Sequence, residues 1–200
     1  MKISIHLSDS AKALLRPGVV LLAVAAVAAF VLGGVSLATS GRIESIAAEK
    51  LSASMQAVLP ADGYEDLGIE DNGEVEAAYA ASNGGWVVQT TESGSQGLVT
   101  MLVGVDGSYA CTGVSILDSS ETAGLGAIAG QASEKGEAFR AQFVGQTAVV
   151  AVTKDGGEID AITGATITSR AVCAGVTAAL EYCAAIEPDG SVPQPLSDAG

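Results

Sequence analysis

The chain has 200 residues, of which 48% are hydrophobic, and its formal net charge at pH 7 is −14. This length allows one soluble domain with accessory segments, and the acidic balance argues against nucleic-acid binding, which needs a basic surface. Three cysteines and one histidine without close metal-ligand spacing argue against a metal centre built by this chain alone.

The first element along the chain is a segment without charge from Pro17 to Gly41. A bilayer-spanning helix needs about 20 mostly apolar residues, so we predict a transmembrane helix over residues 17–39. A cleaved signal peptide is the alternative, although its apolar region is usually only about 7–15 residues long. Basic residues gather before the span, at Lys2, Lys12 and Arg16. This bias predicts a single-pass protein of the cell (inner) membrane. Residues 1–16 would be its cytoplasmic N-terminus, and the main domain would be extracytoplasmic.

A stalk helix and linker are predicted over residues 40–72. Apolar residues from Ile43 to Val58 recur at near-helical spacing, and Pro60 ends the pattern. The acidic charge belongs to the part beyond the span, since 22 of the 23 carboxylates lie after residue 42, with only five of the nine lysines and arginines. Such a composition suits a soluble domain anchored by the preceding helix.

From residue 74 the hydrophobic period changes to that of strands. Short turns such as Asp106-Gly107 separate the apolar runs, so an antiparallel meander is predicted. Its strands are expected at residues 75–80, 86–91, 97–105 and 109–117. A helix at 131–143, a strand at 147–152, an extended segment at 159–162 and a helix after residue 168 should follow.

The predicted fold class is therefore α+β. A single transmembrane helix is followed by a domain over residues 73–187, with a mixed, mostly antiparallel sheet and flanking helices, and by a flexible tail over residues 188–200. If Cys173 and Cys183 share the last helix, they lie too far apart for a disulfide, so only Cys111 could pair with either. Buried free thiols are the alternative.

The most informative segment is Asp160-Ala161-Ile162-Thr163-Gly164-Ala165-Thr166. Gly164 lets the backbone bend near a bulky group. A helix that begins near Thr168 or Ser169, with either residue as its N-cap, would direct free N–H groups toward an anion. Arg170 could add a cationic donor. The segment is therefore a place where a phosphate could be held or attached, and an ordinary turn before a capped helix is the alternative.

This segment resembles the flavinylation motif of the FMN-binding subunits of Rnf- and Nqr-type respiratory complexes. In those subunits a flavin transferase esterifies FMN, through its phosphate, to the last threonine of an Asp-x-x-Ser/Thr-Gly-Ala-Thr sequence. The resemblance implies a covalent FMN on Thr166, with Thr163, Gly164 and Ala165 beside it. It also implies that the transferase reads Asp160.

A second segment, Ser120-Glu121-Thr122-Ala123-Gly124-Leu125-Gly126, resembles the Glu-Thr-Pro-Gly-Leu-Gly loop of the same domains, with Ala123 in place of the proline. This loop lies near the flavin in the family. The resemblance therefore implies cofactor contacts from Glu121, Thr122, Gly124, Leu125 and Gly126. Three aromatic residues could stack on the flavin ring or belong to the core: Tyr79, Trp86 and Tyr109.

The resemblance extends over residues 17–186 and is greatest to the G subunits of Rnf complexes. It implies a covalent-FMN electron carrier within an ion-translocating ferredoxin:NAD oxidoreductase, a translocase in which this chain supplies no catalytic residue. Its implied partners are integral membrane flavin and iron–sulfur subunits. Alternatives are an Nqr C-like subunit, an anchored electron donor to an extracytoplasmic reductase, and an anchored binding protein without redox function.

Overall fold

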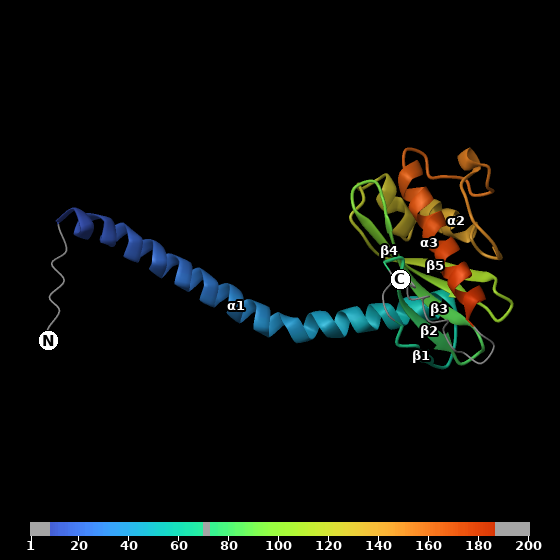
Figure 1. Cartoon of the computed structure of the whole chain (residues 1–200), viewed down its shortest axis with the longest axis horizontal. Coiled ribbons are helices and arrows are strands. Elements are labelled where there is room, and N and C mark those ends of the chain that lie inside the picture. The colour runs from blue at the N-terminus through green and yellow to red at the C-terminus, as the bar shows by residue number, and fades with distance from the viewer. Residues whose placement is uncertain (1–8, 70–72, 187–200) are drawn as a thin grey trace, which may run out of the picture. The chain divides into compact units, whose positions relative to one another are not determined.

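The computed structural model describes residues 9–69 and 73–186, which form two units divided between Glu49 and Lys50. Helix α1 spans Asp9–Val58, and its residues from Lys50 on belong to the second unit (Figure 1). Its segment Pro17–Ser36 is long and apolar enough to cross a membrane, and its side chains are exposed. The predicted apolar helix is thus present and continues into the predicted stalk. The tail predicted at 188–200 and the first eight residues lie outside the described part.

The second unit is built on a five-stranded sheet whose spatial order equals the chain order, which confirms the predicted meander. Every neighbouring pair in it is antiparallel. The only parallel pairing in the described residues is an isolated bridge between Val152 and Ile159, outside this sheet. The strands are β1 (Tyr64–Asp66), β2 (Val75–Ala81), β3 (Trp86–Ser93), β4 (Leu98–Val105) and β5 (Cys111–Ser119).

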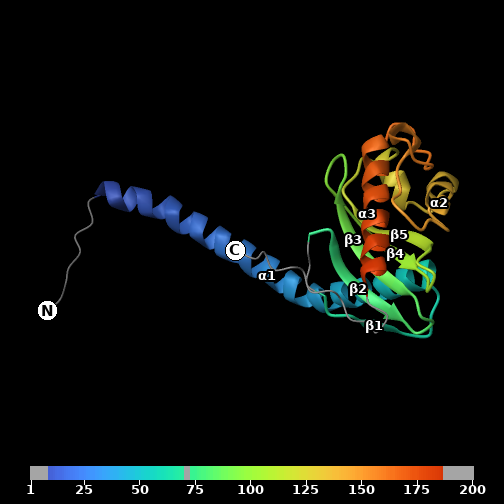
Figure 2. The same cartoon turned by 45° about the vertical axis from the view of Figure 1, so that its right-hand side comes forward.

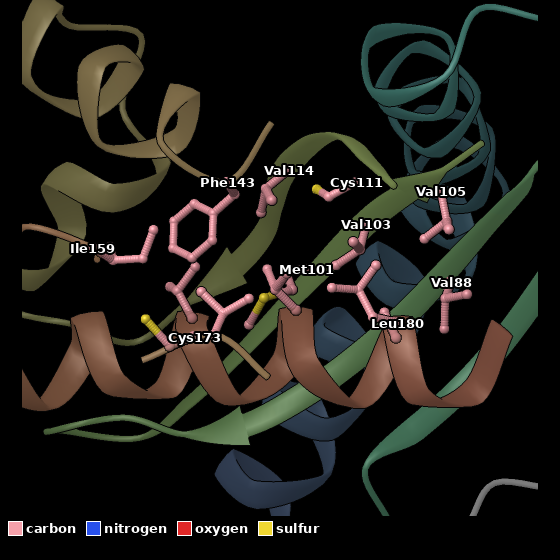
Figure 3. Close-up of a cluster of buried hydrophobic side chains, with 14 of the residues drawn as sticks. Val88, Met101, Val103, Val105, Cys111, Val114, Phe143, Ile159, Cys173 and Leu180 are labelled. Carbon is pink, nitrogen blue, oxygen red and sulfur yellow. The ribbon is translucent and has the colours of Figure 1, made fainter. Parts of the chain in front are cut away.

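Helices cover one face of this sheet. Figures 1 and 2 both show the long α3 lying across that face. Met101 and Val103 of β4 face α3 and pack against Leu180 and Cys173 (Figure 3). The helical elements after the sheet are the 3₁₀ turns η1 (Gly126–Gly130) and η2 (Thr153–Asp155) and the helices α2 (Glu134–Ala141) and α3 (Thr166–Ala185).

The opposite face of the sheet packs against the end of α1. Val87 and Leu102, which alternate with the α3-facing residues, contact a cluster that includes Val58. A Cβ at Gly104 would lie 2.5 Å from the carbonyl oxygen of Val58, so glycine permits this close approach. Thr112 Oγ1 donates a hydrogen bond of 2.5 Å to the same oxygen. The end of the stalk is therefore part of the domain, and the stretch predicted as linker contains β1.

The strand predicted at residues 147–152 does not join the sheet. The N–H of Val150 donates instead to Thr177 Oγ1 of α3, at 2.9 Å, and the same hydroxyl lies 3.4 Å from the carbonyl oxygen of Val150. Thr177 thus satisfies the backbone of Val150, and the end of the segment pairs with Ile159, whose N–H donates to the carbonyl oxygen of Ala151 at 3.2 Å.

All three cysteines are free and buried, so the reading as buried thiols is confirmed. Burial raises the pKa of Cys111 to about 11 and the pKa values of Cys173 and Cys183 to about 12. These thiols stay protonated near neutral pH and behave as small hydrophobic side chains.

Candidate cofactor-binding site

A cleft of about 340 Å³ lies where the loop around Glu121 meets the turn before α3. The two sequence segments singled out above thus come together in space. Of the predicted site residues, Gly124, Thr163 and Asp160 do not line this cleft. Its lining consists of Ser95, Glu121, Thr122, Leu125, Gly126, Lys154, Gly164, Ala165, Thr166, Ile167 and Thr168.

The turn before α3 depends on a glycine. The N–H of Ala165 donates to the carbonyl oxygen of Ile162 at 2.9 Å, and Gly164 has a φ of +79°, a conformation that strains other residues. A Cβ at Gly164 would also lie 3.1 Å from Leu125 Cδ2. Ser169 closes the turn, because its hydroxyl accepts from the N–H of Ile162 and donates to the carbonyl oxygen of Ala165, both at 3.0 Å.

Helix α3 begins earlier than predicted, and neither Thr168 nor Ser169 is its N-cap. Thr166 is the first helical residue, after Ala165 as a cap without a side-chain hydrogen bond. The hydroxyls of Thr168 and Ser169 are buried in the first turn and already bonded elsewhere. The first N–H groups of the helix therefore have no side-chain cap, which leaves an anion-binding end beside the Thr166 hydroxyl.

Glu121 is 9% exposed and uses both carboxylate oxygens inside the protein. Oε1 accepts from the N–H groups of Ser95 and Gln96 at 2.6 and 3.1 Å, and Oε2 accepts from Thr168 Oγ1 at 2.7 Å. Burial raises the pKa of Glu121, but these hydrogen bonds outweigh it, so the pKa lies below its ordinary value. Glu121 therefore joins the β3–β4 turn to α3 and forms part of the cleft lining.

Gly126 stands where the loop touches this buried pair. A Cβ there would come closer than 3.0 Å to both Glu121 and Thr168. A larger residue would push apart the two side chains that hold the loop against α3.

Thr166 is half-buried and lines the cleft. Lys154 Nζ lies 3.4 Å from its Oγ1 and donates a weak hydrogen bond to it. Among the described residues, Lys154 is the only lysine or arginine that lines this cleft. Sequence reasoning missed it, because its position in the turn η2, 12 residues before Thr166, becomes meaningful only after folding.

Arg170, which the sequence offered as a possible cationic donor, does not line this cleft. Its guanidinium binds the carboxylate of Asp155 through two hydrogen bonds of 2.6 and 2.7 Å. The hydrogen bonding by Arg170 also lowers the pKa of Asp155. Arg170 lines a different cleft, and its charge is already paired.

The three aromatic residues lie away from this cleft. Trp86 and Tyr109 stack on each other with ring centroids 5.4 Å apart. Trp86 begins β3 and Ser95 follows its end, so the eight residues of the strand separate them by about 23 Å. Tyr79 packs with the cluster around the end of α1. The core reading therefore applies to Tyr79 and to Trp86, which packs against the main cluster, and Tyr109 stacks on Trp86.

A glycine turn, a cleft and a threonine at an uncapped helix start make this a candidate site for a cofactor with an anionic group. Comparison with known families matches residues 94–181 to the FMN-binding domain. This match includes the whole of the cleft described above.

Whole-chain comparisons extend this result. The chain is 33% identical over 193 residues to the G subunit of the ion-translocating oxidoreductase complex of Methanosarcina acetivorans, covering 90% of this chain and 100% of that protein. It is also 33% identical over 195 residues to the G subunit of the Na⁺-translocating ferredoxin:NAD⁺ oxidoreductase complex of Acetobacterium woodii, covering 85% and 91%. A third relative, the G subunit of the proton-translocating ferredoxin:NAD⁺ oxidoreductase complex of Clostridium ljungdahlii, is 39% identical over 111 residues, covering 52% and 57%.

The chain therefore belongs to the family of G subunits of ion-translocating oxidoreductase complexes. The resemblance to Rnf G subunits inferred from the two motifs is confirmed. This assignment favours the Rnf reading over the Nqr C alternative.

Proposed function

We propose that this protein is the membrane-anchored FMN carrier of an ion-translocating ferredoxin:NAD⁺ oxidoreductase complex, with FMN esterified to Thr166 through its phosphate. The observation that carries the proposal is the placement of Thr166. Thr166 lines the cleft at the uncapped start of a 20-residue helix, and its hydroxyl lies beside Lys154.

The residues around Thr166 suit a phosphodiester, which keeps one negative charge. The first-turn N–H groups of α3 and the positive end of its dipole favour an anion at this position. The Lys154 ammonium can move from the Thr166 hydroxyl to a phosphate oxygen without leaving the cleft, because it already lies 3.4 Å from Oγ1. Together these groups offset the charge that esterification introduces.

The remaining cleft residues suit a flat aromatic ring system. Leu125 and Ile167, 44% and 54% exposed, present apolar side chains beside Thr166. Such surfaces gain stability when a ring covers them. When bound, FMN supplies one- and two-electron transfer, and the protein supplies position and electrostatic tuning. Glu121 and Thr168 keep the two walls of the cleft together, so the site can be rigid before FMN arrives.

The setting of the domain follows from the anchor and the family. Basic residues before the apolar span favour a cytoplasmic N-terminus and an extracytoplasmic domain. A covalent bond suits that location, since FMN lost outside the cytoplasm is not readily replaced. The partners are then the integral membrane flavin and iron–sulfur subunits of the complex, and a flavin transferase that reads Asp160 and modifies Thr166.

The test is covalent labelling of the full chain. We would co-express it with a flavin transferase, denature the purified protein, and look for flavin fluorescence on a gel, beside Thr166→Ala and Thr147→Ala, an exposed threonine outside the motif and the cleft. The proposal predicts a fluorescent band for the wild type and Thr147→Ala, and a dark band for Thr166→Ala. A dark wild-type band, with a known substrate of the same transferase labelled, would contradict it and leave an anchored binding protein as the better account.

A further inference from the structure

The segment that leads to Thr166 is held from α2 by one side chain. Gln142, at the C-terminal cap of α2, accepts a hydrogen bond at Oε1 from the N–H of Asp160 at 2.7 Å. Its Nε2 donates to the carbonyl oxygen of the same residue at 3.3 Å. A single amide group thus satisfies both backbone groups of Asp160, as a neighbouring strand would.

The base of this clamp is rigid. Gln142 lies between Phe139 and Phe143, which are 3% and 0% exposed and meet edge to face with ring centroids 5.3 Å apart. These buried rings fix the end of α2 in the core. The side chain of Gln142 therefore starts from a well-anchored backbone, and its hold on Asp160 restricts where the segment can go.

The clamp leaves the side chain of Asp160 free for other contacts. Asp160 is exposed, and within residues 9–69 and 73–186 its carboxylate has no hydrogen bond or ion pair. At the other end of the segment, Ser169 holds Ile162 and Ala165. The segment from Asp160 to Thr166 is thus fixed near both ends, while Thr163 and Gly164 between them are exposed.

We infer that Gln142 is a positioning residue for the attachment of FMN to Thr166. By holding the main chain of Asp160, it presents the segment 160–166 to the modifying enzyme in one preformed conformation. The exposed carboxylate of Asp160 is then available for that enzyme to bind. Preforming this conformation lowers the ordering cost when the two proteins meet. The inference rests on the proposed function, since it concerns the same modification.

In the chemical step, a bond forms between Thr166 Oγ and the phosphorus of FMN in flavin adenine dinucleotide. The bond from that phosphorus to the bridging oxygen of the pyrophosphate breaks, and adenosine monophosphate leaves. The hydroxyl proton passes to a base of the modifying enzyme. Gln142 touches none of these atoms and acts only through the backbone of Asp160.

The experiment measures initial rates of FMN incorporation into the purified full chain, with a flavin transferase, flavin adenine dinucleotide and varied chain concentration. We would compare the wild type, Gln142→Met and, as a matched control, Gln131→Met. Gln131 is exposed, and within the described part of the chain its side-chain amide makes no hydrogen bond. We expect Gln142→Met to lower kcat/KM about tenfold, mainly by raising KM, because two hydrogen bonds are lost. The control should match the wild type.

A wild-type kcat/KM for a folded Gln142→Met would overturn the inference and leave the proposed function intact. No incorporation into the wild type, with another substrate modified, would instead overturn the proposed function. If Gln142→Met loses its cooperative thermal transition, Gln142→Glu replaces it. That variant keeps an acceptor for the Asp160 N–H but loses the donor to its carbonyl oxygen, so a decrease of about threefold supports the inference and an unchanged rate overturns it.

Discussion

Two threonines in the first turn of α3, only two residues apart, have opposite surroundings. Thr168 is 1% exposed and donates its hydroxyl to the buried carboxylate of Glu121 at 2.7 Å. Thr166 is half-buried and lines the cleft, and within the described residues its hydroxyl has only the weak donor Lys154, at 3.4 Å. The same side chain on the same turn is therefore structural at one position and available for chemistry at the other.

The two walls of the cleft show the same contrast. On the side of Glu121, the polar groups bond to one another inside the protein, since three donors share one carboxylate. On the side of Thr166, Ser169 holds the backbone of the turn at Ile162 and Ala165, while the hydroxyl of Thr166 is half-buried beside Lys154. The Glu121 side of the cleft is therefore a fixed wall, and the Thr166 side is an open wall.

Valine substitutions at the two threonines should affect different properties of the protein. Thr166→Val should abolish covalent FMN incorporation and leave the free energy of unfolding within about 0.5 kcal/mol. Thr168→Val should retain incorporation but lower that free energy by about 2 kcal/mol, because Glu121 keeps its burial and loses a donor. Urea unfolding of the full chain in detergent, followed by the fluorescence of its single tryptophan, Trp86, measures the second quantity. Equal stability losses in the two variants would contradict the contrast.

Removing the centre of the fixed wall should have a large effect on stability. Glu121→Ala leaves the N–H groups of Ser95 and Gln96 and the hydroxyl of Thr168 without their acceptor. We expect a loss of about 3 kcal/mol in the free energy of unfolding, by the same urea measurement. Glu137→Ala is the control, since this glutamate lies on the exposed surface of α2. A Glu121→Ala chain as stable as that control would show that the carboxylate is not the link.

Acid should weaken the fixed wall selectively. The pKa of Glu121 is lower in the folded protein than its ordinary value, so its stabilisation is fully present above the pKa of the unfolded chain, near 4.5. That stabilisation is lost as the pH falls through the lower folded pKa. The stability difference between the wild type and Glu121→Gln should therefore be constant from pH 7 to about pH 5 and shrink below it. A difference that grows as the pH falls would contradict the predicted sign.

The smallest effect concerns the cation at the open wall. Lys154→Met should slow FMN incorporation about fivefold, because one charge partner of the phosphate is lost. Arg170→Met should leave the rate unchanged, since Arg170 is paired with Asp155 and lines another cleft. Rates measured with the transferase on both variants decide this. A larger loss with Arg170→Met would restore the sequence-based assignment of the cation.

The sequence predicted the meander well, because alternating apolar residues and turns such as Asp106-Gly107 are local signals. It missed β1, since Tyr64-Glu65-Asp66 is a short, polar edge strand without alternation. The start of α3 was placed late because Thr168 and Ser169 are typical N-cap residues, and only the fold shows that their hydroxyls bind Glu121 and the turn.

For the site, the sequence identified the two segments that form the cleft but not the residues that connect them. Ser95, Lys154 and Gln142 approach the motifs from distant parts of the chain. No local spacing marks such tertiary contacts. Predicted contacts such as Gly124 and Thr163 belong to the right loops and lie outside the cleft.

The most direct test of the central claim is fragmentation mass spectrometry of the full chain, purified from cells that make a flavin transferase. Our account predicts that a peptide containing residues 160–170 carries the mass of FMN less water, with Thr166 as the modified residue. Flavin attached to Thr163 or Thr168, or an unmodified peptide from a chain that binds FMN only reversibly, would contradict it.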